Sequence, residues 1–250
     1  NVIDKNLPVD ADIPVVAMIT RLVAHKGLDL VEYAMGEIMQ RNLQFVVIGT
    51  GDSKYEEMFN FNAYIHHNKM SANITFNPEL ANKLYAAADI FLMPSKSEPC
   101  GLSQQIAMRY GTVPVVRETG GLVDTVPPLN IETLEGKGFT FKGYNAHDML
   151  GAIDRCIEFY GNREKWETHV KNLIKFNSSW KSSVIEYINL YNDFVLPYSK
   201  SHTSEQDLID KVAKIIDKKS DEILECLNKK TSYVTIEQDI EQKEAEKIKA

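Results

Sequence analysis

The chain has few cysteines, and they form no recognisable pattern. The three cysteines are Cys100, Cys156 and Cys226. They are odd in number and widely spaced, so the sequence shows neither a disulfide framework nor a C-x-x-C metal motif, and a reducing compartment is favoured. We therefore expect a cytoplasmic protein.

Long apolar runs and an excess of positive charge are also missing. No run of apolar residues approaches the roughly 18 that a membrane span needs, so we expect no membrane partner. The chain holds 28 Lys and Arg against 35 Asp and Glu, which gives a formal net charge of -7. A nucleic-acid-binding protein would show a basic patch or stripe, so we expect no nucleic acid partner and only a local basic site.

Length and composition are those of an ordinary globular protein. At 250 residues, with 44% hydrophobic and 25% charged residues, the chain is long enough for one large core or two small ones. It starts at Asn1, without an initiator methionine and without the charged-then-apolar layout of a signal peptide. We interpret it as a fragment of a longer protein.

Strand patterns alternate with helix patterns along most of the chain. The predicted strands are residues 14–19, 44–48, 73–76, 89–94, 113–116 and 138–141. The predicted helices are residues 28–40, 54–67, 78–88, 102–110, 146–159, 163–174 and 179–194. Several strands are apolar without alternation, as in parallel strands that are covered on both faces. About six strands are too few for an eight-stranded barrel, so the pattern predicts an α/β, Rossmann-like doubly wound parallel sheet.

The composition changes near residue 199. We predict a Rossmann-like nucleotide-sugar-binding domain over residues 1–198 and a charged helical tail or linker over residues 199–250. The tail carries a partial apolar stripe among many Lys, Glu and Asp residues, and beyond residue 230 it is too polar to build a core. It fits either a solvated helix and linker or a helix that docks on a neighbouring domain.

Residues 95–104 form the most informative stretch, a turn between a predicted buried strand and a predicted helix. In an open α/β sheet such turns line the crevice at the carboxyl ends of the strands, where helix N–H groups favour anions. Gly101 lets a ligand approach the backbone, and Ser103 adds a hydroxyl donor. Glu98 places a carboxylate beside them. This combination predicts a ligand with phosphate at one end and hydroxyls at the other.

Several short motifs, in this order and spacing, resemble the C-terminal half of bacterial glycogen synthases and plant starch synthases. They are RL and KGLDL (21–22 and 26–30), SEPCGL (97–102), YGT (110–112), TGGLVDTV (119–126) and WKSS (180–183). The resemblance implies a GT-B glycosyltransferase, in which two Rossmann-like domains face each other and this half binds the sugar nucleotide. It implies transfer of glucose from ADP-glucose to the non-reducing end of an α-1,4-glucan, with retention of configuration and with no metal or other cofactor.

The resemblance assigns catalytic roles to three residues. Arg21 and Lys26 match the basic pair that the family places against the donor diphosphate, although by their charge alone they could be solvated loop cations. Glu98 matches an acidic residue near the transferred glucose, where it need not act as a nucleophile. Many retaining GT-B enzymes carry a second Glu eight positions later, but this chain has Ile106 there. The missing carboxylate argues against a two-carboxylate glycosidase.

The resemblance also assigns substrate contacts. The positions that would hold glucose hydroxyls and phosphate are Cys100, Gly101, Leu102 and Ser103. Cys100 could instead be a thiol nucleophile or a small buried apolar residue. Phe76 falls where the family stacks an aromatic ring on adenine, or it is a core residue at a strand end. Gly120 and Gly121 make a tight turn in the cleft wall, or a purely structural turn.

Two other functions stay open. The chain could be a non-catalytic nucleotide- or glucan-binding module, or a related GT-B enzyme that uses a UDP sugar. The opposing N-terminal GT-B domain, which would supply the acceptor surface, has no counterpart in this sequence. We therefore expect ADP or ADP-glucose affinity with little or no turnover from this chain alone.

Overall fold

The computed structural model describes residues 7–176 and the short pieces 184–185, 187–190, 209–211, 213–214 and 219–221. The chain divides into two units, Asn1–Ser178 and Ser179–Ala250. In the second unit, residues 184–185 and 187–190 are helical, within the helix predicted over residues 179–194. The predicted domain boundary after residue 198 lies outside the described residues. Over the part that is described, no helix is long and apolar enough to cross a membrane.

The first unit is built on one six-stranded sheet in which all the strand pairs are parallel. The strands are β1 (Val15–Ile19), β2 (Gln44–Ile48), β3 (Met70–Asn73), β4 (Ile90–Met93), β5 (Val113–Arg117) and β6 (Phe139–Phe141). Their spatial order is β3-β2-β1-β4-β5-β6. This order confirms the predicted doubly wound Rossmann-like sheet. It reverses between β1 and β4, and ligands of such sheets bind at that switch point.

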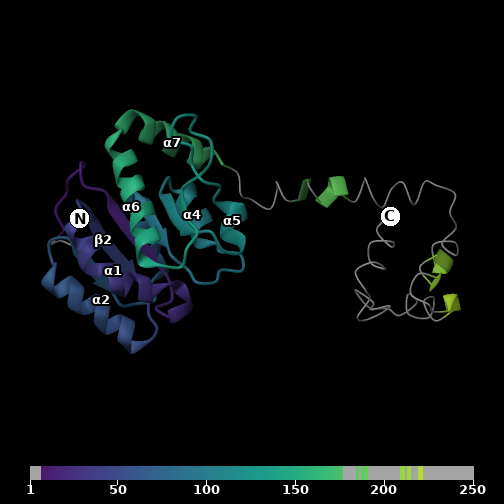
Figure 1. Ribbon diagram of the computed structural model, residues 1–250, viewed down its shortest axis with the longest axis horizontal. Helices are drawn as coiled ribbons and strands as arrows, with labels where there is room; N and C mark the ends of the chain where they lie inside the picture. Colours follow the sequence, from purple (N-terminus) through teal and green to yellow (C-terminus); the bar gives the residue numbers. More distant parts are fainter. Residues whose placement is uncertain are drawn as a thin grey trace. The chain divides into compact units, whose positions relative to one another are not determined.

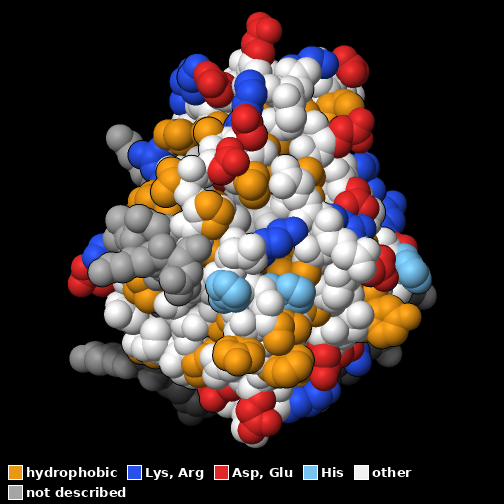
Figure 2. Space-filling model, turned by 90° about the vertical axis from the view of Figure 1, so that its left-hand side faces the viewer, with side chains coloured by type: hydrophobic (Ala, Val, Ile, Leu, Met, Phe, Trp, Pro, Cys, Tyr) orange, Lys and Arg blue, Asp and Glu red, His pale blue; other side chains and the backbone are white. Residues whose placement is uncertain are grey.

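Helices cover the sheet (Figure 1). They are the 3-10 helix η1 (Ala24–Lys26) and the α-helices α1 (Leu28–Gln40), α2 (Ser53–Ile65), α3 (Pro78–Ala87), α4 (Ser103–Arg109), α5 (Gly121–Thr125), α6 (Ala146–Gly161) and α7 (Arg163–Lys175). Helix α1 contacts both α2 and α6, whereas α4 contacts α3 and α7. The face seen in Figure 2 mixes acidic and basic side chains, so charge of neither sign collects on it.

The core follows from the apolar patterns of these elements. All five residues of β2 are buried, as a central parallel strand requires. Helix α1 buries one stripe that includes Val31, Ala34 and Ile38, at the spacing of successive helical turns. Asn77 starts α3, because its side chain accepts a hydrogen bond from the Leu80 N–H at 3.0 Å and Pro78 follows it.

The predicted third strand is wrong by three residues. The prediction rested on Ile74, Thr75 and Phe76, which are residue types common in strands. However, β3 covers Met70–Asn73, and its register pairs Phe45 with Met70 and Ile48 with Asn73. Because β2 ends at Ile48, which lies opposite Asn73, it offers no pairing partner to the residues that follow Asn73. Residues 74–76 therefore leave the sheet, and the Phe76 side chain is 87% exposed.

Candidate active site

A crevice of about 210 Å³ lies where β1 and β4 end, at the switch point of the sheet. Its walls come from the end of β1, from η1, from the end of β4 and from the segment that enters α4. The lining residues are Met18, Ile19, Thr20, Arg21, Lys26, Leu92, Met93, Pro94, Ser95, Glu98, Gly101, Leu102 and Ser103. The crevice thus brings Glu98 together with Arg21 and Lys26, although Lys26 and Glu98 are 72 residues apart in the sequence.

Lys26 and Glu98 form an ion pair inside this crevice. The Lys26 Nζ lies 2.6 Å from the Glu98 Oε2, and the two side chains are only 17% and 9% exposed. The Ser95 hydroxyl donates a second hydrogen bond to the same carboxylate oxygen, at 3.2 Å. The resemblance placed Lys26 at the diphosphate of the donor and Glu98 near its glucose. It did not predict the direct contact between the two side chains.

Lys26 is positioned by a close approach of two backbones. Gly27 ends η1 with a φ of +75°, and a Cβ at this position would lie 2.0 Å from the Pro94 carbonyl oxygen. Only glycine fits there. In addition, the Lys96 N–H donates a hydrogen bond to the His25 carbonyl at 2.9 Å. These contacts hold η1 against the segment that carries Glu98.

Arg117, at the end of β5, fixes the backbone of the same segment. Its Nε donates to the Ser95 carbonyl at 3.1 Å and its Nη2 to the Lys96 carbonyl at 2.9 Å. The ring of Tyr144 lies 5.3 Å from the Arg117 guanidinium, and its hydroxyl donates to Asp29 in the first turn of α1. Burial and this carboxylate raise the pKa of Tyr144. No sequence motif pointed to Arg117 or Tyr144.

Gly120 and Gly121 support the crevice from behind. A Cβ on Gly120, whose φ is +49°, would lie 2.1 Å from the Glu98 carbonyl oxygen. The Gly121 N–H donates to the Glu98 carbonyl at 3.1 Å and to the Pro99 carbonyl at 3.2 Å. Neither glycine is among the residues that line the crevice. Their place fits the structural turn that the sequence left open.

Gln104, which the sequence analysis did not single out, ties the start of α4 together. Its side-chain amide donates to the Gly101 carbonyl at 2.7 Å and to the Thr125 hydroxyl at 2.9 Å, and the residue is fully buried. Gly101, Leu102 and Ser103 line the crevice. Cys100 does not line it, and its exposure rules out the buried apolar role.

A second cavity of about 360 Å³ adjoins the crevice, because Ile19, Thr20 and Arg21 line both. Phe76 lies in the wall of this second cavity, and its 87% exposure excludes a core role. Arg21 is exposed, and the described part of the chain offers its guanidinium no hydrogen bond or ion pair. Its charge is therefore available to a ligand that spans the two cavities.

Metal ligands do not cluster at this site. Among the residues that the structure describes, no group of three or more His, Cys, Asp or Glu side chains could hold a metal ion. The cationic side of the crevice comes from Lys26 and Arg21.

Comparison with known proteins gives the family. The sequence profile of Glycosyl transferases group 1 matches residues 1–173. The chain is 51% identical over 184 residues to a glycogen synthase of Clostridioides difficile and 52% identical over 187 residues to that of Clostridium acetobutylicum. Each match covers 74% of the chain, but only 38% and 39% of the relatives. The chain thus spans about two fifths of the length of these curated relatives.

A solved structure agrees with this assignment. It is the catalytic domain of starch synthase IV from Arabidopsis thaliana, bound to ADP and acarbose. Its TM-score is 0.68 at 33% identity, over 75% of this chain and 40% of that one. The predicted resemblance is confirmed, and the chain belongs to the family of group 1 glycosyl transferases.

Proposed function

We propose that this chain is the sugar-nucleotide-binding half of a glycogen or starch synthase. The complete enzyme would move glucose from ADP-glucose to the non-reducing end of an α-1,4-glucan, with retention of configuration. The observation that carries the proposal is the crevice at the switch point, in which Lys26 is paired with Glu98 and Arg21 lines the same cavity. The glycogen synthase relatives at about 50% identity support the same reaction.

The two adjoining cavities suit the two ends of ADP-glucose. Arg21 lines both, so a diphosphate beside it can reach the Lys26 crevice on one side and the Phe76 cavity on the other. In this arrangement adenine stacks on the exposed ring of Phe76. Gly101, Leu102 and Ser103 face the glucose hydroxyls and the phosphate at the start of α4. Cys100 lies outside the crevice lining, so we assign it at most an indirect role.

The fixed charges suit the departure of ADP. Negative charge grows on the diphosphate as the bond to glucose breaks, and preorganised cations in a partly buried site stabilise that charge. An ammonium group has three donors, so Lys26 can hold Glu98 with one and a phosphate oxygen with another. Glu98 accepts hydrogen bonds from glucose hydroxyls and favours positive charge at the anomeric carbon. Ile106 stands where a second carboxylate would be and is 40% exposed.

The reaction needs a second domain that faces the crevice. Catalysis requires that the acceptor glucan be held against the donor and that water be excluded, and one Rossmann-like domain cannot enclose a cleft. The share of the relatives that the chain spans leaves room for such a facing domain. We propose that an N-terminal GT-B domain supplies the acceptor surface.

A transfer assay tests the proposal. For the assay, the N-terminal half of a clostridial relative is fused in front of this chain. The transfer of radiolabelled glucose from ADP-glucose to glycogen is then measured. We expect transfer with the wild-type sequence and a large loss with Glu98→Gln. Nucleotide affinity without transfer in the complete protein would instead support the non-catalytic module.

A further inference from the structure

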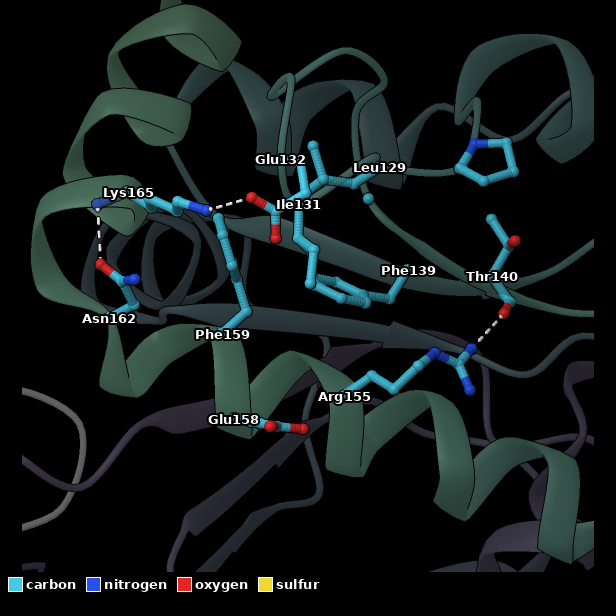
Figure 3. A pocket seen from close by; sticks show the side chains of 12 residues that line it. Leu129, Ile131, Glu132, Phe139, Thr140, Arg155, Glu158, Phe159, Asn162 and Lys165 are labelled. Atoms are coloured by element: carbon cyan, nitrogen blue, oxygen red, sulfur yellow. Dashed lines mark hydrogen bonds and ion pairs between the residues drawn. The ribbon is translucent and has the colours of Figure 1, made fainter.

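A third cavity, larger than the crevice and the Phe76 cavity, lies away from the crevice at the edge of the sheet that β6 forms. It has a volume of about 520 Å³ and lies between residues 128–132, β6, α6 and α7 (Figure 3). It shares no lining residue with the crevice or with the Phe76 cavity. Strand β5 separates β6 from β4, so this edge cavity is a separate place on the domain.

The edge cavity is held open by contacts within the protein. The Leu129 N–H donates to the Gly138 carbonyl at 2.8 Å, which fixes the segment alongside the strand. The Lys165 Nζ lies 2.9 Å from the Glu132 carboxylate, and this exposed ion pair adds a weaker link, of about 0–1 kcal/mol, between residues 128–132 and α7. A ligand would therefore meet a largely preformed site.

Charged groups of both signs surround an apolar floor. The floor is formed by Leu129, Ile131, Phe139 and Phe159. Arg155 and Glu158 project from α6 on one side, and the Glu132–Lys165 pair lies on another (Figure 3). The Arg155 Nη2 donates to the Thr140 carbonyl at 2.8 Å, which leaves its other donors free for a ligand. Two cations and two carboxylates balance, so the lining carries no net charge.

The equal numbers of positive and negative charges in the lining limit the kind of ligand that the edge cavity can bind. A phosphate or another anion would meet two carboxylates, and a purely apolar ligand would desolvate Arg155, Glu158 and the Glu132–Lys165 pair without offering them any polar contact. A neutral sugar instead places its C–H faces on the apolar floor, while its hydroxyls donate to carboxylates and accept from Arg155 and Lys165. The volume is in the range of small-ligand sites.

We propose that the edge cavity binds a short stretch of α-1,4-glucan and so gives the polymer a second attachment point outside the reaction crevice. The choice of glucan rests on the proposed function, since the lining itself specifies only a neutral carbohydrate. A second contact of this kind raises the effective concentration of chain ends near the crevice without any new contact to the donor.

The test is titration of the chain with maltoheptaose, followed by calorimetry and by backbone amide shifts. The variants are Glu158→Ala, which removes a hydroxyl acceptor, and Ile131→Ser, which removes part of the floor. The matched control is Glu167→Ala on α7, whose carboxylate is 67% exposed and lies outside the cavity. ADP is titrated into every variant as an independent measure of the crevice.

We expect maltoheptaose to shift amides of β6 and α6. Glu158→Ala should bind it at least about tenfold more weakly through the loss of one charged hydrogen bond, and Ile131→Ser should bind it about tenfold more weakly through the loss of apolar contact. Glu167→Ala should leave this affinity unchanged, and no variant should alter ADP affinity. Unchanged maltoheptaose affinity in both cavity variants, no maltoheptaose binding by the wild type, or displacement of maltoheptaose by ADP would overturn the inference. Cavity-dependent sugar binding without any ADP binding would uphold the inference and contradict the proposed nucleotide site instead.

Discussion

Replacing Lys26 with methionine should destabilise the domain more than replacing Lys26 and Glu98 together. Lys26→Met keeps most of the side-chain volume but removes the cation that lies 2.6 Å from the Glu98 carboxylate. Glu98 is then left with the Ser95 hydroxyl as its remaining side-chain partner at 3.2 Å. In the double variant Lys26→Met with Glu98→Gln, no charge stays behind in the crevice.

The magnitude follows from burial. Removal of one partner from a buried pair costs about 3–5 kcal/mol, whereas an exposed pair contributes about 0–1 kcal/mol. With the side chains 17% and 9% exposed and Ser95 still in place, we expect the lower limit, about 3 kcal/mol for Lys26→Met. For a domain of this size that loss lowers the unfolding midpoint by about 6–12 °C. The double variant should lie within about 1 kcal/mol of the wild type, because uncharged replacements for a buried pair are often neutral.

The assay is a double-mutant cycle by urea denaturation at neutral pH, with Lys26→Met, Glu98→Gln and the double variant. Glu79 and Lys83, an exposed i,i+4 pair on α3, provide a control cycle with a coupling of at most about 0.5 kcal/mol. If Lys26→Met cost no more than the control, or if the double variant cost the sum of the two single ones, the buried pair would not have the energetic role assigned to it.

Three further predictions concern the turn behind the crevice, the aromatic wall and a buried histidine. Gly120→Ala should destabilise the domain and weaken ADP binding, because its Cβ would lie 2.1 Å from the Glu98 carbonyl; denaturation together with ADP calorimetry checks this, and a neutral result would contradict it. Phe76→Ala should leave stability unchanged, since the side chain is 87% exposed, while ADP affinity falls about tenfold through loss of base stacking; equal affinity would exclude the stacking role. Burial lowers the pKa of His169 below its ordinary value of 6.5, so the unfolded chain takes up the proton first as the pH falls. The stability that neutral His169 contributes is present above about pH 6.5 and is lost as the pH falls below it. Between about pH 7.5 and about pH 5.5, the melting temperature of wild type should therefore fall further than that of His169→Gln. Parallel melting curves for the two proteins would refute this.

The fold could be predicted from the sequence wherever the local pattern and the long-range partner agree. Helix α1 begins and ends at the predicted residues, because Gly27 marks its start and its apolar stripe continues to Met39, next to its last residue. Strand β3 was misplaced because residues 74–76 have the stronger strand composition, but only residues as far as Asn73 lie opposite β2. Strand register depends on the partner strand, which a local pattern does not contain.

The candidate site could be predicted at the level of the crevice but not of its contacts. The switch point follows from the order of strands and turns, so Arg21, Lys26 and Glu98 could be expected at one edge of the sheet. The Lys26–Glu98 contact depends on how closely η1 approaches the end of β4, a tertiary distance. Arg117 was missed for the same reason, since its role lies in two hydrogen bonds to carbonyl groups distant in the sequence.

The central claim is that the crevice binds the diphosphate of ADP through Arg21 and Lys26, and calorimetric titration of the chain with ADP tests it most directly. Arg21→Ala is the sharpest variant, because the described contacts give its guanidinium no structural partner, and Lys83→Ala is the surface control. We predict that wild type and the control bind ADP alike and bind UDP more weakly. We also predict that Arg21→Ala loses at least about tenfold in ADP affinity, the value of one charged hydrogen bond, with no change in unfolding free energy. Absence of ADP binding, or equal binding by Arg21→Ala and wild type, would contradict the account.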